Sequence, residues 1–203
     1  MEKLIITTAL NGNVPTRELT PHVPLTSEDI AQDVARCSEA GAAIFHIHAR
    51  DARAQPTLDM AVFKQTVRLI KARNPEAILQ LSTGARAGKD WDARANPVRL
   101  LPEMASFTTG SNNLPGIVYE NAPAFIRFLA EVFRDTGVKP EIEVFETGMI
   151  NNALHLVKKG FLATPLHFDF VLGAPGAMPG TVKNLVFLAE SLPPGSTWTV
   201  AGI

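Results

Sequence analysis

The sequence of 203 residues predicts an α/β fold, because short β-branched apolar runs alternate along the chain with longer stretches of helical periodicity. Seven such runs occur, and no tight hairpin joins one to the next, so the strands are expected to be parallel. Apolar residues make up 46% of the chain, which supports a sizeable core and excludes a disordered chain. We therefore expect a single domain over residues 1–203.

The predicted strands share β-branched or aromatic residues and end at turn signals. The first covers residues 4–9 and ends at Asn-Gly-Asn. The others cover residues 43–48, 77–82, 104–109, 141–145, 166–172 and 197–201.

The predicted helices are indicated by capping residues and apolar stripes. Thr26 or Ser27 caps the first helix, which ends at Gly41, and Asp59 caps the second. Further helices are expected at residues 97–101, 121–134, 149–159 and 182–191. Two architectures fit seven such units, a doubly wound open sheet and a (β/α)8 barrel.

The faces of the strands favour the barrel. In the second strand Phe45 and Ile47 share one face, while His46 and His48 share the other. Glu143 lies opposite the apolar residues of its own strand in the same way. A strand covered by helices on both faces would be apolar on both, whereas a barrel strand carries polar groups on its inner face near the C-terminal mouth. We predict a TIM (β/α)8 barrel, with the chain ending at about the seventh strand.

The charge balance excludes several classes of partner. Lys and Arg number 19 against 20 Asp and Glu, so neither a nucleic-acid surface nor a polybasic membrane surface is expected. No apolar run approaches the roughly 18–20 residues of a membrane span, and no signal-peptide cleavage pattern is convincing. Cys37 is the only cysteine, which excludes an intrachain disulfide and a Cys-cluster metal site. We expect a soluble, cytoplasmic protein.

The clearest chemical signal is the pair His46-x-His48. Two imidazoles at positions i and i+2 of a strand lie roughly 6–7 Å apart along the chain and point the same way, so both can reach one metal ion. A catalytic metal site also needs a third protein ligand and an open position. The alternative is a pair of core histidines bonded to their neighbours. Arg50 and Asp51 either orient a ligand or belong to an exposed, locally paired loop.

Other polar groups stand at the predicted strand ends. Glu143 is a candidate third ligand, base or orienting group, and otherwise a structural hydrogen-bonding partner. Ser82-Thr83-Gly84 ends the third strand, and Ser106 and Thr108 lie near the end of the fourth. Their hydroxyl and backbone N–H groups suit a carboxylate or phosphate, although ordinary turn chemistry would also account for them.

Five runs together resemble the β-keto acid cleavage enzyme family, formerly a domain of unknown function, whose type member acts on 3-keto-5-aminohexanoate. The resemblance covers the whole chain, in the family's order and spacing. The runs are residues 46–51, 81–84, 140–149, 170–176 and 198–203.

The resemblance implies a TIM barrel with Zn²⁺ held by His46 and His48. It places Ser82 at the substrate carboxylate, Ser106 where the type member has Thr, and Glu143 in the active site. The implied reaction joins a β-keto acid to acetyl-CoA and gives acetoacetate and a new acyl-CoA. The ion would polarise the ketone and stabilise the enolate. Family members form homo-oligomers, often tetramers.

Two departures from the family qualify these expectations. Val14 stands where the type member holds the substrate's amino group with an acid, so a neutral or apolar acyl tail is expected here. The family's third zinc ligand, a Glu beside an Asp, and an Arg would follow Ile203. Since a TIM barrel needs about 250 residues, we expect the chain to be part of a longer protein. The rival interpretations are a metal-dependent aldolase or hydrolase, and a metal-binding barrel without catalysis.

Overall fold

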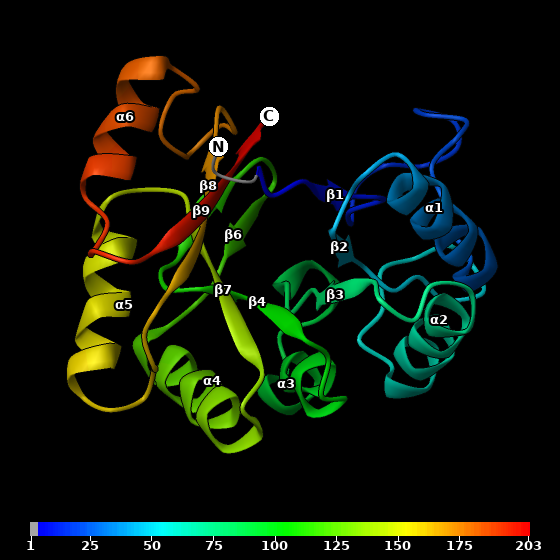
Figure 1. The fold of residues 1–203 in the computed structure, drawn as a ribbon, viewed down its shortest axis with the longest axis horizontal. Helices are drawn as coiled ribbons and strands as arrows, with labels where there is room; N and C mark the ends of the chain where they lie inside the picture. Colours follow the sequence, from blue (N-terminus) through cyan, green and yellow to red (C-terminus); the bar gives the residue numbers. More distant parts are fainter. Residues whose placement is uncertain (1–3) are drawn as a thin grey trace. The chain divides into compact units, whose positions relative to one another are not determined.

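The computed structural model describes residues 4–203 and confirms an α/β fold built from consecutive parallel βα units (Figure 1). The chain divides into two compact units, the first ending at Ala105 and the second running from Ser106 to Ile203. Among residues 4–203, no helix is long and apolar enough to cross a membrane.

The first unit contains the strands β1 (Thr7–Ala9), β2 (Ile44–Ile47), β3 (Ile78–Leu81) and the start of β4 (Met104–Thr108). Each of these strands pairs in parallel with the next. The helices are α1 (Ser27–Glu39), α2 (Met60–Arg73), the short η1 (Ala85–Ala87) and α3 (Trp91–Arg99). In Figure 1, α1 and α2 lie side by side.

The second unit continues from β4 through β7 (Lys139–Val144), β8 (His167–Leu172) and β9 (Thr197–Gly202), in that order. The last three strands pair in parallel. The helices are α4 (Pro123–Thr136), α5 (Gly148–Lys158) and α6 (Val182–Glu190). This order of parallel strands and intervening helices is that of the predicted TIM-barrel class.

The expected alternation along β2 is confirmed by burial. Phe45 and Ile47 are both fully buried, in a core that also holds Leu79 and Leu81 of β3. His46 between them is partly exposed. Since successive side chains of a strand point to opposite faces, this burial fixes the apolar face of β2 and leaves the histidines on the other.

The predicted helix starts are confirmed where a capping residue was present. Thr26 caps α1 through a capping box with Asp29, and the Asp59 carboxylate accepts the N–H of Ala61 at the start of α2. The prediction for α3 was wrong about its start, because Pro97 lies inside the helix and Asp90 caps it.

Two further strands were missed, and the expectation that no hairpin occurs was wrong. β5 (Asn112–Leu114) and β6 (Ile117–Tyr119) pair in antiparallel fashion around Pro115-Gly116. Gly116 has a φ of 72°, the conformation that a Pro-Gly turn requires of its second residue. Each strand has only three residues, too few to show a period of two.

The hairpin also explains the Gly-rich loop of residues 173–180. A Cβ on Gly176 would lie 1.8 Å from the carbonyl oxygen of Asn113 in β5, so only glycine permits this close approach. The N–H of Met178 in the same loop donates to the carbonyl of Phe145. The loop is therefore packed on the protein.

One carboxylate links a helix to a strand in the first unit. Glu103 accepts a hydrogen bond from Lys71 of α2 at 2.5 Å and one from the N–H of Leu79 in β3 at 3.0 Å. Burial raises the pKa of Glu103, but these two donors outweigh it and hold the pKa below the ordinary 4.5.

Candidate active site

The strongest sequence signal, the two histidines, is brought together at the end of β2. The Nε2 atoms of His46 and His48 are 2.8 Å apart, and the ring centroids are 4.7 Å apart. The rings converge through nitrogens that can bind a metal, as a shared strand face requires.

Gln80 of β3 determines which nitrogen of His46 carries the proton. The two residues are register partners on adjacent parallel strands, and Nδ1 of His46 contacts Oε1 of Gln80. A carboxamide oxygen only accepts hydrogen bonds, so Nδ1 of His46 is the protonated nitrogen. In the neutral ring Nε2 then keeps its lone pair and faces His48. Sequence reasoning did not identify Gln80, because its role depends on the pairing of two strands.

His48 is held neutral by its surroundings. Burial lowers the pKa of this imidazole well below its ordinary 6.5, and the repulsion that a proton on His48 would meet from a protonated His46 and from Arg50 lowers it further. Metal ligation needs the neutral form, so this environment favours binding of a cation.

Asn11 fixes the backbone at His48. Its amide nitrogen donates to the carbonyl of His48 at 2.8 Å, and its oxygen accepts the N–H of His48 at 3.2 Å. Asn11 is buried and follows β1, where the sequence indicated only a turn. Both backbone hydrogen-bonding groups of His48 are therefore satisfied by one side chain from the neighbouring segment.

A catalytic zinc requires three protein ligands, and two converging imidazole nitrogens are suited to serve as two of them. Two nitrogens bound to one tetrahedral zinc lie about 3.3 Å apart, given Zn–N distances near 2.05 Å, so the rings would separate by about 0.5 Å. Within residues 4–203, no group of three or more His, Cys, Asp or Glu side chains could hold a metal ion. Within residues 4–203 the histidine pair therefore offers two candidate nitrogen ligands without a third His, Cys, Asp or Glu beside them.

Ser82 and Gly84, which follow β3, line a small concavity together with His48. The hydroxyl oxygen of Ser82 accepts a hydrogen bond from the N–H of Gly84 at 3.3 Å. The carbonyl oxygen of Thr83 accepts one from the Nε–H of Arg94 at 2.9 Å. The structure thus brings part of the predicted carboxylate-binding segment to the histidines.

Arg50 is buried, which rules out the exposed-loop interpretation for this residue. Its guanidinium donates to the carbonyls of Gly12 and Pro15 at 2.7 and 3.1 Å, and to that of Ala54 at 3.0 Å. Val14 lies within the segment held in this way, and its side chain is 58% exposed.

The second unit holds the other predicted polar group, Glu143. The hydroxyl of Thr108 in β4 donates to Oε2 of Glu143 in β7 at 2.5 Å. Thr108 lies 3.1 Å from the hydroxyl of Tyr119 in β6. Since the proton of Thr108 points at the carboxylate, Tyr119 donates to Thr108. The hydroxyls of Tyr119 and Thr108 therefore form a hydrogen-bonded chain that orients Glu143. Ser106, which precedes Thr108 on β4, is buried.

Tyr119 is the only tyrosine of the chain and was missed at the sequence level. It is 7% exposed and reaches Thr108 because the β5–β6 hairpin folds back beside β4. A Pro-Gly turn signal before an apolar triplet was the available clue.

Glu141 of β7 belongs to a buried pair. Its Oε1 lies 3.2 Å from Nε2 of His167, whose Nδ1 is 2.8 Å from the hydroxyl of Thr197. Glu141 and His167 are register partners on β7 and β8. No partner for His167 could be inferred from sequence spacing, because the pair depends on this register.

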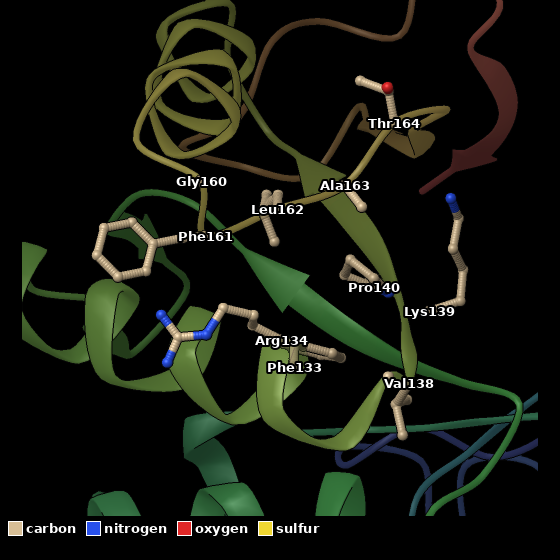
Figure 2. Close-up of a pocket in the computed structure, with 11 residues that line it drawn as sticks. Phe133, Arg134, Val138, Lys139, Pro140, Gly160, Phe161, Leu162, Ala163 and Thr164 are labelled. Atoms are coloured by element: carbon tan, nitrogen blue, oxygen red, sulfur yellow. The ribbon is translucent and has the colours of Figure 1, made fainter.

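A pocket in the second unit lies at the opposite ends of the strands, where α4 ends and β7 begins (Figure 2). The ammonium of Lys139 donates to the carbonyl of Pro165, and burial lowers the pKa of Lys139 from 10.5. The Arg134 guanidinium lies 5.8 Å from the ring centroid of Phe161 and pairs with Asp135. Lys139 and Arg134 are therefore both already engaged by groups of the chain. The N-terminal ends of the strands in a βα fold generally serve stability, so this pocket is not the candidate active site.

Comparison with known proteins identifies the family of the chain. The beta-keto acid cleavage enzyme family matches residues 3–203. The chain is 43% identical, over 204 residues, to the 3-keto-5-aminohexanoate cleavage enzyme of Fusobacterium nucleatum subsp. nucleatum, covering 100% of this chain and 74% of the relative. It is 36% identical to the 3-oxoadipate:acetyl-CoA acetyltransferase of Cupriavidus necator, covering 98% of this chain and 71% of the relative.

Solved structures agree on the fold. The apo structure of ObcA matches with a TM-score of 0.67 and 28% identity, over 76% of this chain. The chain spans 37% of the length of that ObcA chain. A mandelate racemase/muconate lactonizing protein from Herpetosiphon aurantiacus, at 14% identity and a TM-score of 0.53, shares the fold alone. Because the family matches residues 3–203 and a relative of that activity is 43% identical, the chain belongs to the beta-keto acid cleavage enzyme family.

Proposed function

We propose that the protein is an acyltransferase that joins a β-keto acid to acetyl-CoA and releases acetoacetate and a new acyl-CoA. The observation that carries the proposal is the convergence of His46 and His48, with the proton of His46 directed away from the pair by Gln80. Relatives named for acetyl-CoA-dependent transfer, such as the Cupriavidus necator enzyme, support the choice of co-substrate.

We propose that His46 and His48 hold Zn²⁺, together with a further ligand that is not among the described residues. When bound, the ion would supply Lewis-acid polarisation of the substrate's keto group. Gln80 keeps His46 in the tautomer that binds, and Asn11 holds the His48 backbone in place.

We propose that Ser82, Thr83 and Gly84 bind the carboxylate of the β-keto acid. The carboxylate would need hydrogen-bond donors, and this segment places the hydroxyl of Ser82 beside His48. The Ser82 hydroxyl oxygen is engaged only as an acceptor by Gly84, so its proton is available to a ligand.

Glu143 is proposed as the catalytic carboxylate that contacts the substrate, with Ser106 and Thr108 beside it on β4. The proton of Thr108 orients one carboxylate oxygen, Oε2. A carboxylate oriented in this way is suited to accept a proton or a hydrogen bond from substrate.

We propose that Val14 contacts the acyl tail and disfavours an ammonium group there. Val14 is 58% exposed and uncharged, so it offers no counter-charge to an ammonium group on the tail. Relatives are named for 3-oxoadipate, 3-dehydrocarnitine and 3,5-dioxohexanoate, so tails of different chemistry occur among them. For the assembly we propose a homo-oligomer, a tetramer, which light scattering on the purified protein tests directly.

The test incubates the protein with a panel of β-keto acids, with and without acetyl-CoA, and measures acetoacetate and the new acyl-CoA. Turnover only with acetyl-CoA supports the proposal, whereas turnover without it favours a metal-dependent aldolase or hydrolase. His46→Ala and His48→Ala should each lose zinc on metal analysis, and unchanged zinc in both would refute the ligand assignment. Zinc binding without any turnover would indicate a binding protein.

A further inference from the structure

A cavity of about 630 Å³ lies in the first unit, beside the loop that follows β2 and the first turn of α1. Its walls come from residues 16–18 and 50–55, the start of α1 and one face of α2. None of the chemistry proposed above uses this space. Its volume is within the range of about 300–1,000 Å³ that small-molecule sites occupy.

Three arginines line the cavity, Arg17, Arg50 and Arg53, against two acids, Glu18 and Asp51. The carboxylate of Asp51 is engaged within its own loop, where it accepts the N–H groups of Arg53 and Gln55 at 2.8 and 2.9 Å. The wall thus carries three guanidinium groups against two carboxylates, an excess of one positive charge among the lining residues, which favours an anionic ligand.

Arg50 provides an independent observation in favour of an anionic ligand. The side chain is 5% exposed, and its two terminal nitrogens donate to three backbone carbonyls. Its Nε is buried and has no hydrogen-bonding partner among residues 4–203. A buried donor without an acceptor is destabilising, and because Nε is itself buried, a ligand oxygen would satisfy it only when the guanidinium turns toward the cavity.

The two other arginines are accessible to a ligand. Arg53 is exposed, and its guanidinium forms no hydrogen bond or ion pair within the described part of the chain. Arg17 is 57% exposed and forms an ion pair with Asp29 at 2.6 Å. Guanidinium groups present fixed pairs of donors that match the oxygens of a phosphate.

We infer that this cavity binds the phosphate-bearing end of coenzyme A, an inference that rests on the proposed function. The coenzyme carries a diphosphate and a 3′-phosphate, whereas a β-keto acid offers a small carboxylate. Arg50 lies only two residues beyond His48, and roughly 7 Å of extended chain separates them. The pantetheine arm of the coenzyme separates its phosphates from the thioester, so the two ends can occupy neighbouring sites.

The test uses the whole protein and the variants Arg17→Ala, Arg53→Ala and the double variant. Each single change should raise the KM for acetyl-CoA about fivefold, since an exposed charge pair contributes about 1 kcal/mol. The double variant should show about 25-fold, and kcat and the KM for the β-keto acid should stay unchanged. Arg36→Ala is the matched control, because Arg36 lies on α1, pairs with Asp33 and is absent from the cavity wall.

Truncated cosubstrates identify the contacting group. With acetyl-pantetheine, which has no phosphates, wild type and double variant should have the same KM. With acetyl-dephospho-CoA the effect of the double variant should shrink if the 3′-phosphate is the group bound, and stay the same if it is the diphosphate.

Direct calorimetric titration with CoA separates failure of this inference from failure of the proposed function. Wild-type affinity in the double variant would overturn the location and leave the function intact. Loss of CoA affinity in the double variant supports the cavity even if no β-keto acid is turned over. A wild-type protein that binds no CoA would overturn both.

Discussion

Replacing Gln80 by Leu tests whether the proton on His46 controls metal binding. Gln80 is fully buried, and its Oε1 accepts the proton of Nδ1 in His46. Leucine has a similar volume but no acceptor, so a buried N–H would lose its partner at a cost of about 1–3 kcal/mol. The ring can relieve this cost by moving its proton to Nε2, which removes the lone pair that faces His48.

The expected result is a 10- to 100-fold loss of zinc affinity, about 1.4–2.7 kcal/mol. Competition against a chromophoric chelator near neutral pH measures this loss, and circular dichroism checks that the variant is folded. Gln80→Glu should retain affinity, because a carboxylate accepts the same proton. Gln32→Leu, on the exposed face of α1, is the matched surface control.

The refuting result is specific to this contact. If Gln80→Leu binds zinc as tightly as wild type while His46→Ala does not, then Gln80 does not set the binding tautomer. If His46→Ala also keeps wild-type affinity, the metal assignment itself is wrong.

The remaining predictions concern the carboxylates and the tail of the substrate. Thr108→Val should lower kcat for the β-keto acid by about tenfold, because the hydrogen bond to Glu143 contributes about 1.5 kcal/mol. Thr108→Ser, which keeps the hydroxyl, should have the kcat of wild type. Equal kcat in wild type and both variants would contradict the positioning role of Thr108. Glu103 has a lowered pKa in the folded state, so its contribution to stability is complete above pH 4.5 and is lost as pH falls through the folded pKa. The unfolding free energies of Glu103→Gln and wild type should therefore differ at neutral pH, by at most about 1 kcal/mol, and should converge in acid. Glu76→Gln is the exposed control. A difference that grows as the pH falls would contradict the lowered pKa of Glu103. Val14→Asp should raise kcat/KM for an amino-substituted β-keto acid relative to its neutral analogue, and an unchanged ratio would show that Val14 does not contact the tail.

Properties that depend on local periodicity could be predicted from the sequence. The alternation of Phe45 and Ile47 with the histidines followed from the period of a strand, and the caps Thr26 and Asp59 marked the starts of two helices. These signals lie within a few residues of one another. Parallel βα order followed from the same local patterns, since each unit is recognisable alone.

Features that depend on pairing between distant segments could not be predicted in the same way. Gln80 reaches His46 through the register of β2 and β3, and Glu141 meets His167 through that of β7 and β8. Tyr119 depends on a hairpin whose strands are too short to have a readable period. In each case the sequence supplied the residue, and only the register between strands supplied its partner.

The way in which Arg50 holds residues 12–15 has an evolutionary consequence. The Arg50 guanidinium donates hydrogen bonds to the carbonyl oxygens of Gly12 and Pro15. These oxygens belong to the backbone, so they are present whatever side chains the segment carries. The exposed side chain at position 14 can therefore be exchanged without loosening its support. If the proposed contact of Val14 with the acyl tail holds, one substitution at this position would change the preferred tail while leaving the support of the segment intact.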